Sequence, residues 1–267
     1  MSAPRSKRSS GVLLSEQRGP VLTLSLNRLA QNNTLNQELR QALLGALSQA
    51  KSNSEIRAVI LTGEGEETFC SGLDLPELAA LTPFEVEAVA LEVRKIHEAL
   101  LALDVPTIAV IKGACIGSGL ELALHCDIRL ARSDARFAFP GVGLGITPGG
   151  GSVQRLVQLA GGGAAHSLFL TGSVINAERA FSLGLLMSVI PPGNFAEALR
   201  EFLDYIVSLP PLAVKEIKVL LRAALAMESA EIVAQGAAAL RRCFEDGTIS
   251  ERLRQLYAGP APGTTLH

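Results

Sequence analysis

Residues 113–127 read GACIGSGLELALHCD, and this stretch decides the fold. The apolar run TIAVI at 107–111 precedes it and predicts a buried strand. Three glycines, beginning at Gly113, then predict a turn, and the apolar residues from 120 to 124 predict a helix. A strand, a glycine-rich turn and a helix in succession expose free backbone N–H groups at the positive end of the helix dipole. The sequence therefore predicts a place where a developing negative charge is stabilised.

One carboxylate, that of Glu121, falls in the first turn of this apolar helix, where a charged residue needs a partner or a chemical role. The glycine pattern lacks the third glycine of a dinucleotide fingerprint and the G-K-S/T of a P-loop. Ser118 has glycine on both sides, but not at the spacing of a nucleophile elbow. Two interpretations stay open. The turn is an anion site of backbone amides beside an acid, or it only packs helix on strand while the glutamate complements the dipole.

Length and composition narrow the class of protein. The 267 residues suffice for one large domain or a domain with an appendage, and 48% of them are apolar. The net charge of -2 argues against a general nucleic-acid or membrane-surface partner, and no apolar run reaches bilayer length. The four histidines show no metal-ligand spacing, so we expect no metal. The four cysteines form no C-x-x-C pair, which predicts free, packed thiols in a cytoplasmic protein: Cys70, Cys115, Cys126 and Cys243.

Hydrophobic periodicity predicts the remaining elements. The predicted strands lie at residues 21–26, 58–63, 127–131, 137–140 and 186–190. The predicted helices lie at residues 35–50, 83–103, 195–208, 212–226, 230–245 and 249–257. These elements divide the chain into a tail at 1–10, a core at 11–195, a helical region at 196–258 and a second tail at 259–267. His97 is interpreted as a surface or hydrogen-bonded histidine, and Asp74 and Asp127 as residues that hold backbone amides.

Several stretches match a known family in order and spacing across residues 12–220. They are Asn27-Arg28, FCSGLDL at 69–75, PTIAVIKGA at 106–114, IGSGLELA at 116–123 with Cys126-Asp127, PGGG at 148–151, QRL at 154–156 and LTG at 170–172. Together they resemble the crotonase (enoyl-CoA hydratase/isomerase) superfamily. The resemblance implies an α/β spiral of ββα units and a helical C-terminal region that packs between subunits of trimers or hexamers. It also implies a coenzyme A thioester as substrate, with no separate cofactor.

The resemblance implies a thioester oxygen held between the backbone N–H groups of Leu73 and Ser118. Glu121 falls on the first of two acid/base carboxylates that hydratases of this family carry, and Gly141 falls on the second. Glycine cannot hold a water or move a proton. The reaction therefore stays open between hydration, dehydration or isomerisation of an enoyl-CoA, decarboxylation of a malonyl-type acyl-CoA and thioester hydrolysis. Binding of a coenzyme A thioester without catalysis is the alternative of a different class.

Four residues of the two turns are assigned to the ligand site: Ser71, Asp74, Leu75 and Gly117. Arg28 resembles a family position near the coenzyme A phosphates, although an exposed arginine needs no such role. Lys215 and Lys218 either reach the phosphates, across a subunit boundary, or are simply solvated. Residues 75–93 and 141–146 are expected to line the acyl pocket, but no motif identifies the acyl group.

Overall fold

The structure is a computed structural model that describes residues 11–224, 238, 241–242 and 245–246. The chain divides into two compact units, Met1–Val207 and Ser208–His267. The predicted tails fall outside the described residues, as do the predicted helix at 249–257 and most of the one at 230–245. No helix of the described part is both long and apolar enough to cross a membrane.

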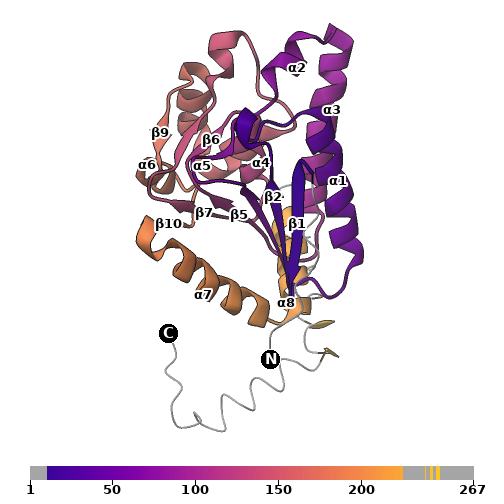
Figure 1. Cartoon of the computed structure of the whole chain (residues 1–267). Coiled ribbons are helices and arrows are strands. Elements are labelled where there is room, and N and C mark those ends of the chain that lie inside the picture. The colour runs from indigo at the N-terminus through magenta and orange to yellow at the C-terminus, as the bar shows by residue number, and fades with distance from the viewer. Residues whose placement is uncertain (1–10, 225–237, 239–240, 243–244, 247–267) are drawn as a thin grey trace. The chain divides into compact units, whose positions relative to one another are not determined.

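The first unit is built on a six-stranded sheet with the order β1-β2-β3-β5-β7-β10 (Figure 1). β1 pairs antiparallel with β2, and every other pair is parallel. The inner strands β3 and β5 are almost wholly buried, as is typical of parallel strands covered on both faces. The strands are β1 (Leu13–Arg18), β2 (Val21–Leu26), β3 (Ala58–Gly63), β5 (Thr107–Ile111), β7 (Ile128–Arg132) and β10 (Ser188–Ile190).

A second sheet of four short strands has the order β4-β6-β8-β9. Its members are β4 (Thr68–Cys70), β6 (Ala114–Ile116), β8 (Arg136–Ala138) and β9 (Ile175–Asn176). The chain passes from β3 to β4, from β5 to β6 and from β7 to β8, and each time it continues into a helical segment. Three successive ββα turns result, which confirms the predicted spiral.

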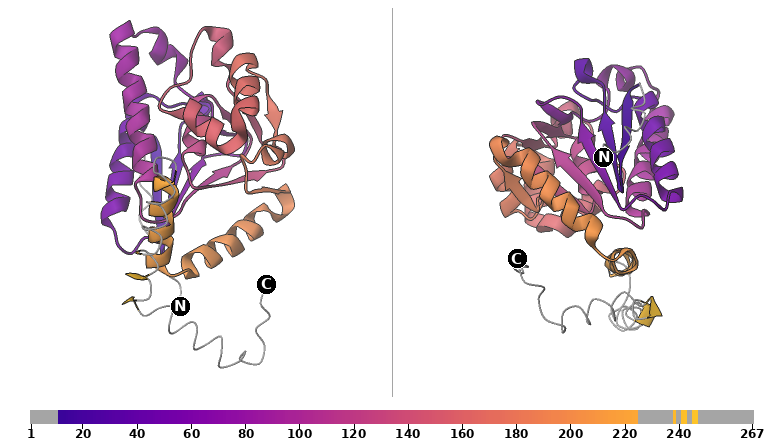
Figure 2. Two further views of the ribbon diagram at one scale, coloured as in Figure 1. Left: turned by 180° about the vertical axis from the view of Figure 1, so that it is seen from behind. Right: turned by 60° about the horizontal axis from the view of Figure 1, so that its bottom comes forward.

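Most helices occupy the segments between these strands, and η3 (Pro192–Asn194) and α7 (Phe195–Ser208) follow the last strand, β10. The others of the first unit are η1 (Leu29–Gln31), α1 (Gln37–Ser52), α2 (Leu75–Ala79), α3 (Pro83–Leu101), α4 (Ser118–Leu124), η2 (Pro140–Leu144), α5 (Ser152–Thr171) and α6 (Ala177–Ser182). α1 and α3 run side by side along one flank of the first unit (Figure 2). A capping box of Thr82 and Glu85 begins α3, and Gly161 interrupts α5 with a φ of 79°. In the second unit, α8 (Pro211–Ala223) is described.

The structure corrects several predicted boundaries. The predicted strand at 137–140 is β8, which ends at Ala138, because Pro140 begins η2. The predicted strand at 186–190 is shortened to β10. β1, β4, β6 and β9 were not predicted, and β6 forms within the stretch that the glycines marked as a turn.

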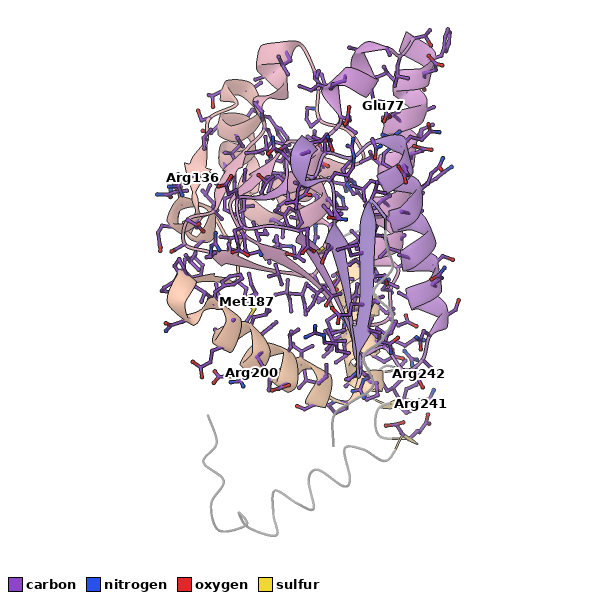
Figure 3. All side chains as sticks on the ribbon, in the orientation of Figure 1. Glu77, Arg136, Met187, Arg200, Arg241 and Arg242 are labelled. Carbon is purple, nitrogen blue, oxygen red and sulfur yellow. The ribbon has the colours of Figure 1, made fainter. Side chains whose placement is uncertain are left out.

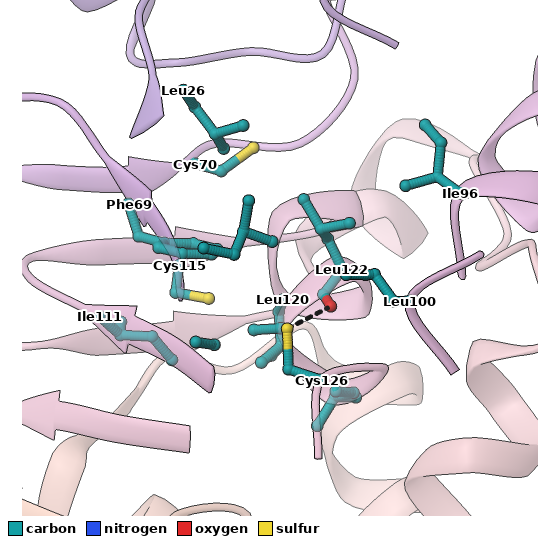
Figure 4. Close-up of a cluster of buried hydrophobic side chains, with 14 of the residues drawn as sticks. Leu26, Phe69, Cys70, Ile96, Leu100, Ile111, Cys115, Leu120, Leu122 and Cys126 are labelled. Carbon is teal, nitrogen blue, oxygen red and sulfur yellow. Dashed lines mark hydrogen bonds between the residues drawn. The ribbon is translucent and has the colours of Figure 1, made fainter. Parts of the chain in front are cut away.

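Three cysteines lie in the core between the two sheets and α4 (Figure 4). Cys70, Cys115 and Cys126 are free and buried, as predicted, and Cys243 lies outside the described residues. Burial raises the pKa of the Cys70 thiol to about 12. A thiol that stays protonated is a poor nucleophile, so these cysteines act as packing residues.

Glycines allow the two sheets and α4 to approach each other closely. Gly113 joins β5 to β6 with a φ of 60°, and a Cβ there would lie 1.9 Å from the carbonyl oxygen of Glu67. A Cβ on Gly119 of α4 would lie 2.2 Å from the carbonyl oxygen of Cys70 in β4. The packing of α4 directly on β4 therefore requires glycine at position 119.

We expect Gly119→Ala to destabilise the protein by about 2–3 kcal/mol, because the added methyl group overlaps the β4 backbone. Gly45→Ala is the matched control, since Gly45 is exposed on α1 and nothing lies within 4 Å of its Cβ position. Removing glycine from a helix interior should stabilise that variant by about 0.5–1 kcal/mol. Urea unfolding measures both changes, and equal stability of the two variants would contradict this packing.

Candidate active site

The site forms where three parallel strands of the small sheet end. β4, β6 and β8 are neighbours and run in the same direction, so their carboxyl ends share one edge. Ligands of parallel α/β sheets commonly bind at this edge. β4 leads into the turn before α2, β6 leads into α4, and β8 leads into η2. Leu73, Ser118 and Gly141, distant in sequence, therefore line one cavity.

The first turn follows β4 and includes Gly72, whose φ is 96°. The Leu35 amide donates to the Gly72 carbonyl at 2.8 Å, and the Ser71 amide donates to the Asn32 carbonyl at 3.1 Å. These bonds fix the turn on the segment before α1. Among the hydrogen bonds of the described residues, none is donated by the Leu73 amide.

The second turn follows β6 and leads through Gly117, with a φ of 53°, into the first residue of α4. The Gly117 amide donates to the Ala138 carbonyl at 2.9 Å. The next amide, that of Ser118, has no acceptor in the described part of the chain, as expected at a helix start. A Cβ on Gly72 would lie 3.1 Å from the Ser118 nitrogen, so the two turns touch. The oxyanion role of the Leu73 and Ser118 amides stays a prediction.

Glu121 lies in the first turn of α4 with only 3% of its surface exposed. Its Oε1 accepts a hydrogen bond of 3.3 Å from the Gly149 amide. Burial raises the pKa of Glu121 to about 7, although hydrogen bonds from the Ser118 hydroxyl and the Gly149 amide favour the ionised form. Both the protonated and the ionised form of this carboxyl are therefore populated near neutral pH, which suits a group that both accepts and releases protons.

Gly141 lies in η2, just after β8, and lines the same cavity. The Ile146 amide donates to its carbonyl oxygen at 2.8 Å, which closes the η2 segment into a compact loop. A Cβ on Gly141 would lie 2.9 Å from the Ile146 carbonyl oxygen. The predicted position of the second carboxylate is thus occupied by backbone packing that leaves little space for a side chain.

The cavity at this edge measures about 250 Å³. Among the described residues of its wall, Glu121 is the only one with an ionisable side chain. The polar side chains beside it belong to Ser71, Ser118 and Thr147. The rest is mainly apolar: Leu75, Leu78, Phe139, Val142, Leu144, Ile146, Phe169 and Leu170.

Only part of this wall was predicted from the sequence. Of the predicted range 75–93, only Leu75 and Leu78 reach the cavity, while 141–146 contributes as expected. Phe169 and Leu170 of α5 were missed, although the LTG motif at 170–172 marked that segment. The Gly149 amide was also missed, because a backbone donor leaves no signal in the residue type.

An ion-pair network centred on the buried Arg40 holds α2, which carries two of the wall residues. Arg40 of α1 contacts Glu77 of α2 at 2.8 Å and Glu92 of α3 at 2.9 Å (Glu77 is labelled in Figure 3). Glu77 also accepts a hydrogen bond from the Gln37 amide at 2.8 Å. These contacts join α2 to α1 and α3 and so position Leu75 beside the cavity.

Asp74, which follows the first turn, forms a partly buried ion pair with Arg28, whose Nη1 lies 2.8 Å from Oδ2 of Asp74. Asp74 also accepts from the Glu77 amide, as the N-cap of α2, and from the Thr34 hydroxyl. The hydrogen bond from Arg28 and the other donors hold the pKa of Asp74 below its usual range, despite some burial. The interpretation of Asp74 as a residue that holds backbone amides is confirmed, and the phosphate role of Arg28 stays a prediction.

Two other sequence assignments fall elsewhere in the chain. Asp127 accepts from the Thr107 amide at 2.8 Å, which confirms its structural role. Lys218 lies on α8 in the second unit, and its role at the coenzyme A phosphates stays a prediction. In the described part of the chain, no group of three His, Cys, Asp or Glu side chains is arranged to hold a metal ion.

Known proteins resemble this chain in sequence and in structure. The family model described as enoyl-CoA hydratase/isomerase matches residues 16–256. A short-chain-enoyl-CoA hydratase of Clostridium acetobutylicum is 38% identical over 200 residues, which cover 75% of this chain and 77% of that protein. A crotonyl-CoA hydratase of Syntrophomonas wolfei is 34% identical over 203 residues, 76% of this chain and 78% of that protein. The crystal structure of an enoyl-CoA hydratase from Bacillus anthracis matches with a TM-score of 0.89 at 32% identity, over 93% of this chain and 96% of that one.

We expect Glu121→Gln to gain stability relative to the wild type as the pH rises. The unfolded chain releases the Glu121 proton near pH 4.3, whereas the folded protein holds it until about pH 7 because its pKa is raised. The free energy of unfolding of the wild type therefore falls by on the order of 3 kcal/mol as the pH rises from the unfolded pKa to about 7. The glutamine variant carries no such proton and does not lose this stability. Urea unfolding of both proteins between about pH 4.5 and 8 measures the change. A difference that is independent of pH would contradict the raised pKa.

Proposed function

This chain belongs to the enoyl-CoA hydratase/isomerase family, and we propose that it processes an acyl-CoA thioester through an enolate, with Glu121 as its acid/base group. The enolate oxygen is held by the amides of Leu73 and Ser118. Coenzyme A enters as part of the substrate. The observation that carries this proposal is that one buried carboxyl and two amides, neither with an acceptor among the described residues, line a single cavity.

The two amides supply the electrostatic part of the chemistry. Each lies in a turn that glycine and neighbouring hydrogen bonds fix, so no reorganisation is needed when charge develops on the oxygen. A donor of this kind contributes about 100- to 1000-fold in rate. The contact of Gly72 with the Ser118 amide supports the view that both donors serve one oxygen.

Glu121 supplies the proton transfer in the hydration direction. As a water oxygen bonds to the β-carbon, Glu121 takes a proton from that water. The electron pair of the carbon–carbon double bond then joins the α-carbon to the carbonyl carbon, and the carbonyl electron pair moves to the thioester oxygen. The enolate then takes the same proton back at its α-carbon, which regenerates the thioester and the ionised glutamate. A pKa of about 7 for Glu121 suits both steps.

Gly141 favours a second candidate, decarboxylation of a malonyl-type acyl-CoA. Loss of carbon dioxide leaves the electron pair on the α-carbon, so no base is needed, and one acid then protonates the enolate. The apolar wall argues in the other direction, because no described residue of that wall carries a cation to pair with a substrate carboxylate. An uncharged acyl chain suits the wall better. Hydrolysis of the thioester and binding without catalysis remain the further alternatives.

The proposal extends to the assembly and the location of the protein. We propose a homotrimer or hexamer, which would cover apolar side chains such as Leu170 and Val174, exposed in the single chain. The buried free thiols of the described residues support a reducing compartment, and we propose the cytoplasm.

We expect Glu121→Gln to lower turnover by at least about 100-fold while the affinity for coenzyme A stays near that of the wild type. Glutamine preserves the shape of the side chain but cannot move the proton. Glu87→Gln is the control, because Glu87 is an exposed glutamate of α3. Steady-state kinetics with calorimetric coenzyme A binding provides the measurement, and unchanged turnover would reject Glu121 as the acid/base group.

We expect hydration of crotonyl-CoA to be at least about 100-fold slower than in a hydratase with both carboxylates, because one acid/base group is missing. Incubation with a panel of acyl-CoA thioesters, read by mass spectrometry, separates the candidates. Addition of one water indicates hydration, loss of carbon dioxide indicates decarboxylation, and free coenzyme A indicates hydrolysis. Affinity without any product would support binding alone, and crotonyl-CoA hydration at the full rate would refute the one-carboxylate limit.

A further inference from the structure

Two histidines stack behind the candidate site. His97 of α3 and His125, which follows α4, have ring centroids 3.8 Å apart and ring planes within 7° of parallel. Their surfaces are only 1% and 4% exposed. Of the two interpretations of His97, the surface position was wrong, because the residue is buried. The hydrogen-bonded one is confirmed for Nδ1, which lies beside the Gly150 carbonyl oxygen, whereas Nε2 has no partner in the described part of the chain.

The hydrogen bonds of the pair define its tautomers. His97 Nδ1 lies 3.0 Å from the Gly150 carbonyl oxygen, and His125 Nδ1 lies 2.8 Å from the Glu121 carbonyl oxygen. A carbonyl oxygen only accepts, so both Nδ1 atoms carry the proton and donate. A second proton on His97 would go to Nε2, which is buried without an acceptor. Both rings are therefore neutral under ordinary conditions.

The surrounding charges also oppose protonation of the stack. Arg129 donates to the carbonyl of Cys126, and Arg155 donates to the carbonyl of Leu124, so two cations lie near His125. Burial lowers the pKa of His97 to about 4, against opposing effects of its hydrogen bond to Gly150 and of Glu98 on the same helix. Burial, together with the repulsion that a protonated His97 would exert, lowers the pKa of His125 to about 3.

A series of contacts begins at the carboxyl of Glu121 and returns to its main chain. The carboxyl accepts from the Gly149 amide at 3.3 Å. The carbonyl oxygen of the next residue, Gly150, accepts a hydrogen bond from His97 Nδ1. The His97 ring stacks on that of His125, and His125 Nδ1 donates to the carbonyl oxygen of Glu121. Gly150 has a φ of 59°, and a Cβ there would lie 2.8 Å from His97 Nδ1. The loop at 149–151 thus rests directly on the His97 ring.

We propose that the His97–His125 stack is a positioning element, which holds the loop at 149–151 so that the Gly149 amide stays on the Glu121 carboxyl. His97 acts through the loop and touches no substrate, so it is a positioning residue and not a catalytic one. The inference rests on the proposed function only for the role of Glu121 as acid/base. The effect on the Glu121 carboxyl itself is independent of that role.

The test follows the titration of Glu121 by NMR in protein labelled with ¹³C at the glutamate carboxyl, with Glu121→Gln to assign the resonance. His97→Leu removes the donor to Gly150, so the Gly149 amide loses its fixed place. Loss of a donor to the ionised carboxyl should raise the Glu121 midpoint by about one pH unit. His97→Asn, whose Nδ2 replaces the Nδ1 donor, should restore the wild-type midpoint.

His166→Leu is the matched control. His166 also lies 2.7 Å through Nδ1 from a carbonyl oxygen, that of Gly162, but it is exposed on α5 and should not change the midpoint. If the leucine variant does not fold, His97→Phe retains a ring on His125 without the donor, and the same rise is expected. A midpoint equal to that of the wild type in the folded variant that lacks the donor would overturn the proposal.

The NMR test of the positioning role and the turnover test of the proposed function can fail independently of each other. A shifted midpoint in a protein that turns over no acyl-CoA would support the positioning role and reject the enzymatic one. Turnover that depends on Glu121, with a midpoint that His97 does not affect, would reject the positioning role alone. In an active enzyme, the limb of the pH–rate profile due to Glu121 should move with the NMR midpoint.

Discussion

Gly72 lies against the amide nitrogen of Ser118, and the candidate site depends on that contact. A Cβ at position 72 would lie 3.1 Å from this nitrogen and would cover one of the two donors that the site presents. The contact exists because β4 and β6 are parallel neighbours whose turns leave the sheet at the same edge. Glu121 follows three residues after Ser118, so the same turn that frees an amide also delivers the carboxyl.

The state of Glu121 results from opposing effects, of which burial is the largest. Burial among apolar side chains favours the neutral acid, while the Ser118 hydroxyl and the Gly149 amide favour the anion. A pKa of about 7 leaves both forms populated, so a single residue can accept a proton and return it. This property matters more here than in a site with two carboxylates, where acid and base are different residues.

The sequence predicted the parts of the fold that depend on apolar runs and on glycine. The strand at 107–111, the glycine turn and the α4 helix with Glu121 in its first turn are present as predicted. β4, β6 and β9 were not predicted, because strands of two or three residues are too short to show a period. The Gly149 donor and the His97–His125 stack join segments that are distant in sequence, and no local pattern encodes such contacts. The family resemblance showed that glycine replaces an acid at position 141. Only the structure shows that the Ile146 carbonyl oxygen lies close to where a side chain there would begin.

The bond from the Ile146 amide to the Gly141 carbonyl has a consequence for how this chain can change. With the loop closed in this way, the Ile146 carbonyl oxygen occupies the space into which a new side chain at position 141 would first extend. A single codon change to glutamate would strain the backbone before its carboxylate reached the cavity. The loop would have to be rebuilt first, by substitutions that bring no catalytic gain of their own. A single substitution at position 141 therefore cannot place a second carboxyl in the cavity without a change in the backbone of the 141–146 loop.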